Sequence, residues 1–212
     1  MKNILKGLET FQLTIFEKEQ ELFARLAQGQ SPDTLLITCS DSRISPDMLL
    51  QVRPGELFVM RNAGNIVPAY GASNGGEAAA LEFAVAVLGV KDIIVLGHSG
   101  CGALKAVLAP ETVSHLPALS QWIRQAEATR RIVVENHADL EGAALLEKAI
   151  GHNVLRQLDN LRTHPSVASR LERGDLSLHA WCYSIEEGLV RGFNSTTKSF
   201  DALVGERSTA IR

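Results

Sequence analysis

Two short segments of this sequence carry side chains that together could hold a metal ion. Cys39 opens the run Cys-Ser-Asp-Ser-Arg at residues 39–43, and the run Gly-His-Ser-Gly-Cys-Gly at residues 97–102 contains His98 and Cys101. Two thiolates and one imidazole suit zinc, which prefers sulfur and nitrogen donors in a tetrahedral arrangement. No further cysteine or histidine lies near either run in the sequence. One position of the tetrahedron is therefore left for water, as in catalytic rather than structural zinc sites.

The charge of this ligand set predicts how the metal would behave. Two thiolates cancel the charge of Zn²⁺, so the ion is a weaker Lewis acid than zinc held by three neutral histidines. Water on such an ion loses its proton at a higher pH. We therefore expect an activity that rises towards alkaline pH.

Asp41 and Arg43 lie within the first run and leave two arrangements open. An aspartate two residues from a ligand could reach the metal itself, and the site would then be closed and inert. Alternatively, the planar guanidinium of Arg43 could hold Asp41 away from the metal in a bidentate pair. The carboxylate would then stay ionised and orient the water on the metal by accepting its hydrogen bond. We predict the second arrangement and assign both residues to catalysis.

The elements that must position these runs alternate between strand and helix. Apolar runs predict strands at 35–39, 57–60, 92–96 and 176–184, and helical spacing predicts helices at 2–28, 73–88, 118–128, 140–161 and 166–172. Ser73 or Asn74 is the predicted cap of the second helix. The alternation indicates an α/β fold: a mainly parallel central sheet with helices on both faces and an N-terminal helical arm.

This fold would bring the two candidate runs together, because each follows the end of a predicted strand. Open parallel sheets bind ligands at the carboxyl ends of their strands. Neighbouring strands lie about 5 Å apart, so loops leaving adjacent strands can share one ion. We treat residues 1–212 as a single domain, with a helical arm at 1–30 and an α/β core at 31–212.

Composition excludes several classes of function. Apolar residues make up 45% and charged residues 21% of the 212 residues, and the formal charge is −3. Such a chain has no bulk attraction to nucleic acid or to an anionic membrane. The N-terminus has no long apolar stretch, so we expect a cytoplasmic protein. Three cysteines, an odd number, favour thiol chemistry or metal binding over a disulfide framework.

Together, the two runs resemble the β-class carbonic anhydrases, closest to the plant-like branch and to bacterial members that accompany cyanate degradation. Other segments match that family in order and spacing: 54–59, 61–65, 75–76, 82–83, 164–167 and 178–181. The resemblance implies an added edge strand and one Zn²⁺ per chain, with Cys39, His98 and Cys101 as its ligands. It also implies a homodimer or a higher homo-oligomer built from dimers. In that family the helical arm embraces a partner, and the active-site cleft lies at the dimer interface.

The same resemblance implies which residues contact the substrate. Gln30 matches a glutamine that hydrogen-bonds substrate, and the backbone N–H of Gly102 matches a second donor. Phe58 and Phe83 match aromatic positions that line the cleft. Carbon dioxide needs a small, largely apolar pocket, and in our reading Phe58, Ala63, Val67 and Phe83 would line it.

The predicted function is the zinc-dependent, reversible hydration of carbon dioxide to bicarbonate and a proton. Two alternatives stay open: hydrolysis of a related heterocumulene, carbon disulfide or carbonyl sulfide, and a non-catalytic zinc-binding scaffold. Another branch of the family has a tryptophan at the position of Leu36, as part of a bicarbonate site that shuts the enzyme down. We therefore expect the open form at neutral pH.

Overall fold

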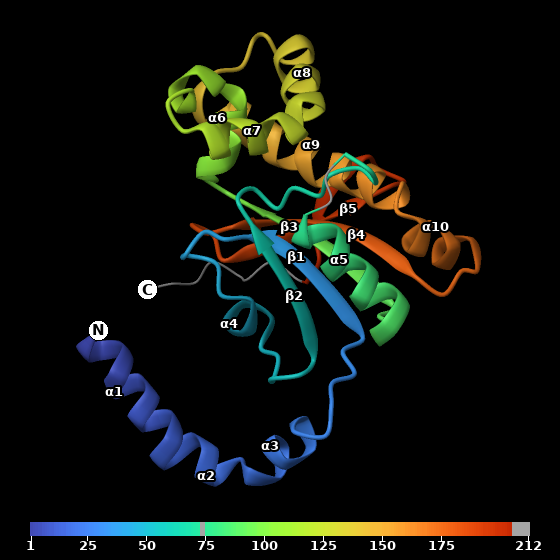
Figure 1. Cartoon of the computed structure of the whole chain (residues 1–212). Helices are drawn as coiled ribbons and strands as arrows, with labels where there is room; N and C mark the ends of the chain where they lie inside the picture. The colour runs from blue at the N-terminus through green and yellow to red at the C-terminus, as the bar shows by residue number, and fades with distance from the viewer. Residues whose placement is uncertain (73–74, 205–212) are drawn as a thin grey trace.

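A computed structural model describes residues 1–72 and 75–204, and the predicted cap at Ser73 or Asn74 lies outside these residues. Its centre is a sheet of six strands in the order β2-β1-β3-β4-β5-β6 (Figure 1). The strands are β1 (Thr34–Cys39), β2 (Leu57–Asn62), β3 (Asp92–His98), β4 (Ser177–Ser184), β5 (Leu189–Asn194) and β6 (Ser199–Ala202). The four predicted strands are thus confirmed as β1 to β4.

The sheet is parallel except at one edge. Strands β2, β1, β3 and β4 pair in parallel, whereas β4–β5 and β5–β6 pair antiparallel. The family resemblance implies one added edge strand, and the structure has an antiparallel pair, β5 and β6, at that edge. The mainly parallel α/β fold is confirmed.

Strand β1 is central because its side chains are apolar on both faces. Leu35, Leu36 and Ile37 have no exposed surface, which is typical of parallel strands covered on both sides. Leu35 and Ile37 pack in one core cluster with residues of α5, α9 and α10, while Leu36 packs on the opposite face with Leu49 and Leu50. Helices therefore lie on both faces, as predicted.

The helices differ from the predicted ranges mainly in how they are divided. Those of the core are α4 (Pro46–Leu50), α5 (Gly76–Glu82), α6 (Gly102–Leu108), α7 (Pro117–Ile123), α8 (Glu127–Asn136), α9 (Gly142–Arg162) and α10 (Pro165–Glu172). A π-helical segment, Phe83–Leu88, extends α5. The predicted helix at 118–128 is instead α7, a 3₁₀ turn and the start of α8. The short helices α4 and α6 were not predicted, because five to seven residues show little periodicity.

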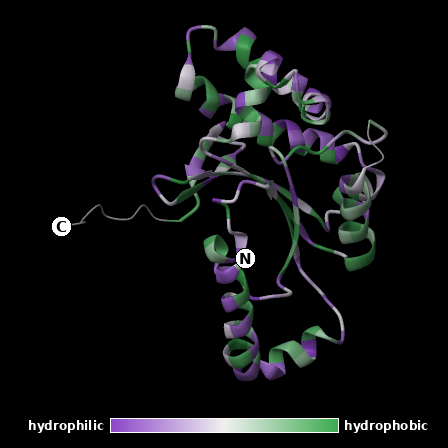
Figure 2. Cartoon of the chain, turned by 60° about the vertical axis from the view of Figure 1, so that its left-hand side comes forward, coloured by the Kyte–Doolittle hydropathy of each residue, from purple (hydrophilic) through white to green (hydrophobic). Residues whose placement is uncertain are grey.

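The N-terminal arm extends away from the core (Figures 1 and 2). It contains α1 (Lys2–Thr10), a π-helical segment (Phe11–Ile15), α2 (Phe16–Lys18) and α3 (Gln20–Leu26), and no residue of these helices is buried. Large apolar side chains of the arm stand open to solvent: Ile4, Leu5, Leu8, Leu13, Ile15 and Phe16. The predicted helical arm is therefore present, with an apolar stripe that this chain does not cover itself.

Within the described ranges, no helix combines the length and the apolar character needed to cross a lipid bilayer.

Close packing between β3 and α9 yields a stability prediction. A Cβ added at Gly97 would lie 2.9 Å from Cγ1 of Val154 and 3.0 Å from Cγ2 of Ile150. Gly97→Ala should therefore lower the free energy of unfolding by about 1–3 kcal/mol through overpacking, measured by urea denaturation at fixed protein concentration. Gly7→Ala is the matched control, because nothing lies within 4 Å of a Cβ there. Equal stability of the two variants would contradict the packing argument.

Candidate metal centre

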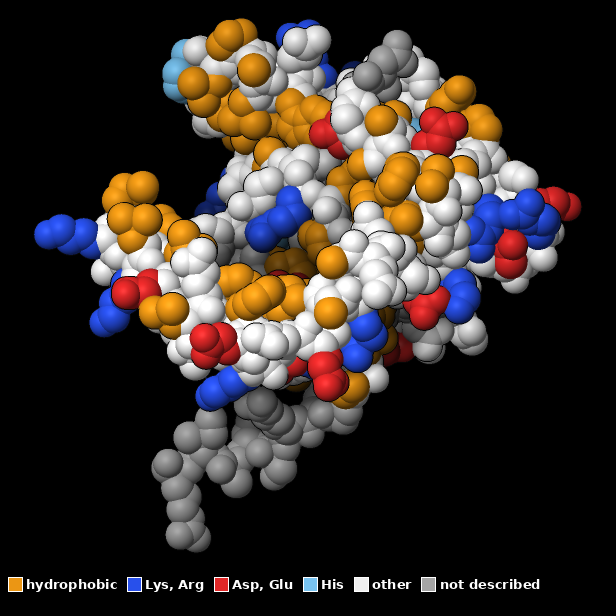
Figure 3. Space-filling view, turned by 60° about the horizontal axis from the view of Figure 1, so that its bottom comes forward, with side chains coloured by type: hydrophobic (Ala, Val, Ile, Leu, Met, Phe, Trp, Pro, Cys, Tyr) orange, Lys and Arg blue, Asp and Glu red, His pale blue; other side chains and the backbone are white. Residues whose placement is uncertain are grey.

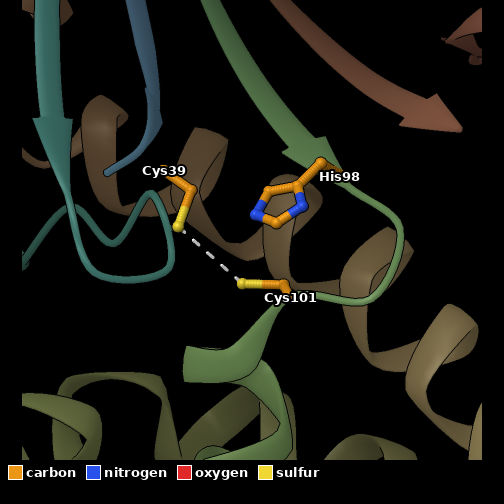
Figure 4. Close-up of side chains that lie close together, drawn as sticks. All are labelled: Cys39, His98 and Cys101. Carbon is orange, nitrogen blue, oxygen red and sulfur yellow. Dashed lines mark hydrogen bonds between the residues drawn. The ribbon is translucent and has the colours of Figure 1, made fainter. Parts of the chain in front are cut away.

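Three buried side chains meet at the carboxyl edge of the parallel sheet. Cys39 is the last residue of β1, His98 is the last residue of β3, and Cys101 directly precedes α6. Strands β1 and β3 are neighbours in parallel register, with Thr38 opposite Leu96. This pairing brings together the two runs that lie far apart in the sequence (Figure 4).

The separations of the ligand atoms match one metal ion. A sulfur of each cysteine and a ring nitrogen of His98 all lie within 4.8 Å of one another. The two sulfurs are 3.9 Å apart, and two thiolates on a tetrahedral zinc with bonds of about 2.3 Å would lie about 3.8 Å apart. In the described part of the chain this is the one group of three such residues close enough for an ion.

The ring of His98 is oriented as a metal ligand. Its Nδ1 lies 3.0 Å from the carbonyl oxygen of Ser99, an acceptor that places the ring proton on Nδ1 and leaves a lone pair on Nε2. The ring has no exposed surface, and Nε2 has no hydrogen-bond partner. A buried, unpaired nitrogen costs free energy unless a ligand satisfies it. The donor set and this orphaned nitrogen therefore fit zinc.

Hydrogen bonds stabilise the thiolate form of Cys39. The hydrogen bond from the thiol of Cys101 is the largest cause of a lowered pKa of Cys39; burial opposes it, and the backbone N–H groups of Gly64 and Asp41 add to the lowering. The N–H of Gly64 lies 3.3 Å from the sulfur. The hydrogen bond with Cys39 and burial raise the pKa of the Cys101 thiol. A metal ion bound between the two sulfurs would replace this hydrogen bond, because it binds both cysteines as thiolates.

Asp41 and Arg43 form the bidentate pair that the sequence analysis predicts. Arg43 donates from Nε to Oδ1 of Asp41 at 2.9 Å and from Nη2 to Oδ2 at 2.7 Å, and its backbone N–H also donates to Oδ1. These bonds hold the pKa of Asp41 far below its ordinary value. Oδ2 also lies 3.9 Å from Nε2 of His98. The carboxylate is therefore ionised, restrained and next to the metal-binding atoms.

Other residues hold this pair in place, and the sequence analysis assigned none of them a function. Arg43 donates to the carbonyl of Gly100, and Arg61 donates to the carbonyls of Cys39 and Asp41. Gly100 has a φ of +65°, and a Cβ there would lie 3.7 Å from the guanidinium of Arg43. Arg61 lies near the carboxyl end of β2, so the rule that located the other site residues could have identified it.

The remaining predicted site residues divide into two groups. Ala63 follows β2 at the metal-binding edge, where Asn62 pairs with Cys39, and Gly102 follows Cys101 as the first residue of α6. Phe58 pairs with Leu35, and each lies four residues before the end of its strand, Asn62 or Cys39. Leu35 is therefore about 13 Å from Cys39 along β1. Phe83 packs on Phe58 with ring centroids 6.2 Å apart. Gln30 is exposed and precedes β1 at its amino end. The structure therefore does not bring Gln30, Phe58 and Phe83 of one chain to its own metal centre.

The position corresponding to the family's regulatory tryptophan is part of the core. Leu36 has no exposed surface and packs with Ile94 and Leu96 on the face of the sheet opposite to Leu35 and Ile37.

An α/β fold with a Cys-His-Cys centre at the edge of its parallel strands defines a class of zinc proteins, and comparisons with known proteins specify the family. The family model described as carbonic anhydrase matches residues 34–190. A carbonic anhydrase of Synechocystis sp. is 48% identical over 203 residues, which cover 95% of this chain and 74% of that protein. The chain belongs to the β-class carbonic anhydrases.

Solved structures agree with this assignment. The β-carbonic anhydrase CcaA superposes with a TM-score of 0.94 at 48% identity, covering 95% of this chain and 98% of that one. One of two tetrameric β-carbonic anhydrases from Sordaria macrospora superposes with a TM-score of 0.82 at 26% identity, covering 91% and 96%.

Metal content tests the ligand set directly. Cys39→Ser, His98→Ala and Cys101→Ser should each reduce bound zinc from about one ion per chain to below about a tenth, because two remaining ligands hold zinc weakly. Atomic emission on dialysed protein gives the ratio of zinc to chain.

Cys182→Ser is the matched control for these variants. Cys182 lies in the same sheet. Burial raises the pKa of its thiol to about 12, so the thiol stays protonated. This variant should keep its zinc. Full zinc content in any of the three ligand variants would contradict the assignment.

Proposed function

We propose that this protein catalyses the reversible hydration of carbon dioxide to bicarbonate and a proton at the centre formed by Cys39, His98 and Cys101. One observation carries the proposal: three ligand atoms converge, while the nearest carboxylate, Asp41, is held in a bidentate pair by Arg43. A tetrahedral ion held by three protein ligands keeps one position for water. Membership of the carbonic anhydrase family supports the reaction.

The chemistry divides between the metal and the chain. Bound zinc supplies a Lewis acid that lowers the pKa of water, so that a hydroxide nucleophile is available. Asp41 accepts the hydrogen of the attacking oxygen and so directs a lone pair of that oxygen at the carbon of carbon dioxide. Because Arg43 occupies both carboxylate oxygens of Asp41, the carboxylate stays ionised and does not take up the proton released by the reaction.

We assign the substrate contacts of this edge to Ala63 and Gly102. Ala63 offers a small apolar side chain beside the metal centre, and the N–H of Gly102 at the start of α6 points the positive end of a peptide dipole at a developing anion. Carbon dioxide is too small to supply much binding energy, so the rate comes from the positioned nucleophile.

We further propose that the active site is completed by a second copy of the chain, in a homodimer or a larger assembly of dimers. Gln30 and Phe58 lie at the amino ends of the strands and Phe83 packs on Phe58, away from their own metal centre. We therefore assign them as cleft residues for a partner. The exposed apolar stripe of the arm, with Ile4 70% and Leu5 56% exposed, supports a partner surface. Figure 3 shows further apolar side chains around a hollow in the surface. The tetrameric relatives from Sordaria macrospora support such an assembly.

Two alternative functions would use the same metal site, and each can be separated from carbon dioxide hydration. Hydrolysis of carbon disulfide or carbonyl sulfide would use the same nucleophile, so turnover of each gas separates this alternative from hydration. A non-catalytic scaffold needs a fourth protein ligand, and the pairing of Asp41 with Arg43 argues against it.

A cytoplasmic location is supported by the free thiols of Cys39 and Cys101, which a reducing compartment preserves.

Asp41→Asn tests the orienting carboxylate. The amide removes the negative charge while keeping the size of the side chain, so zinc content should be unchanged and kcat should fall by about 10²-fold or more. Stopped-flow hydration of carbon dioxide on metal-analysed protein measures both quantities. Glu111→Gln, at an exposed position in the 3₁₀ turn Pro110–Val113, is a control for loss of one carboxylate. Wild-type activity of Asp41→Asn would refute the assigned role.

The arm yields a prediction about assembly. Leu5→Glu combined with Leu8→Glu places two charges in the apolar stripe, so the dimer should dissociate to monomers and activity should fall at least about tenfold. Light scattering coupled to gel filtration gives the mass. Lys6→Glu, on the opposite side of α1 by helical spacing, should leave the mass of the assembly and the activity unchanged. A dimer with full activity in the double variant would contradict the two-chain site.

A further inference from the structure

One peptide group links an indole to the sulfur of Cys39. The N–H of Gly64 donates to Sγ of Cys39 at 3.3 Å. The carbonyl of the same peptide group belongs to Ala63, and it accepts a hydrogen bond of 2.8 Å from Nε1 of Trp122. Trp122 lies on α7 and packs, half-buried, in the core cluster that contains Cys39 and Cys101.

The two hydrogen bonds reinforce each other. The described peptide bonds are all trans, so the carbonyl oxygen and the amide hydrogen of this peptide point in opposite directions. A donor at the oxygen polarises the amide and makes its N–H a stronger donor; such chains strengthen each bond by about 10–30%. The effect of Trp122 is therefore exerted on the sulfur through this peptide group.

Gly64, which carries this N–H, is restrained on its other side, so the effect has a fixed direction. Asn153, which is 1% exposed, donates from Nδ2 to the carbonyl of Gly64 at 3.0 Å. Gly64 has a φ of +84°, and a Cβ there would lie 3.1 Å from Cβ of Ala103 and 3.2 Å from Cδ2 of Leu104. The loop therefore has little freedom to turn the Gly64 N–H away from the sulfur.

We propose that Trp122 is a positioning residue that tunes the metal through the Ala63–Gly64 peptide group and the sulfur of Cys39. The strengthened N–H···S bond withdraws electron density from the sulfur. The sulfur then neutralises less of the charge of the bound zinc, and the ion polarises water more strongly. Because two thiolates make this zinc a weak Lewis acid, such a correction favours activity near neutral pH. The inference rests on the proposed zinc function.

The test replaces the donor without removing the aromatic ring. In Trp122→Phe the peptide oxygen loses its indole partner, so the N–H···S bond weakens and the sulfur gains electron density. In the Co²⁺-substituted protein the thiolate-to-cobalt absorption band should move to longer wavelength. In the zinc enzyme kcat at neutral pH should fall about 1.3- to 4.6-fold, because 10–30% of the free energy of a charge-assisted hydrogen bond is lost. The rate should recover towards alkaline pH.

Two controls separate this effect from loss of packing. Trp181→Phe deletes an indole on the opposite face of the sheet, where Trp181 packs with Leu36 and Leu96; the cobalt band should not move. Benzothienylalanine at position 122 keeps the shape of the indole but replaces its N–H with sulfur, and it should reproduce the band shift even where Trp122→Phe folds poorly.

Three outcomes are informative. A shifted band with a profile moved to alkaline pH supports the proposal. An unshifted band in both position-122 variants overturns it, even if activity falls, because a packing defect would then explain the loss. Absence of any thiolate-to-cobalt band in the wild-type protein would instead refute the metal centre itself.

Discussion

The parallel pairing of β1 with β3 is the interaction on which the metal centre depends. Each strand ends in a metal ligand, Cys39 or His98, and the backbone ladder aligns the two ends at one edge of the sheet. Both strands are buried beyond their first residue and mostly apolar, so a slip in register would cost core packing as well as hydrogen bonds. The position of the ligands is therefore determined by the same hydrophobic burial that stabilises the fold.

Charge is balanced around this edge by short-range partners. Backbone N–H groups and the thiol of Cys101 stabilise the buried thiolate of Cys39, and the half-exposed Arg43 pairs with Asp41. The buried thiolate would be costly without its partners. Combined with a divalent cation, two thiolates and an aspartate–arginine pair leave the centre close to neutral. This balance explains how a reactive group of side chains is compatible with the interior of the protein.

The arm and the amino ends of the parallel strands are the features that support the proposed partner. The apolar stripe of α1 is uncovered in the single chain, and the aromatic pair Phe58 and Phe83 lies away from its own metal centre. A dimer that buries the stripe and joins the amino edge of one sheet to the carboxyl edge of the other would satisfy both features. Catalysis and assembly would then be linked.

The sequence by itself determined the ligand residues, the parallel strands and the helical arm, because short-range patterns carry these features: apolar runs, helical spacing and chemistry at strand ends. It left open whether Asp41 faces the metal freely or is held by Arg43, and the tertiary structure decided for the bidentate pair. It gave no signal for Trp122 or Asn153, because their partners lie in loops distant along the chain. The predicted strands already put Gln30 and Phe58 at amino ends, away from Cys39 at a carboxyl end. Only the tertiary structure showed that Phe83, which lies on a helical segment, packs on Phe58.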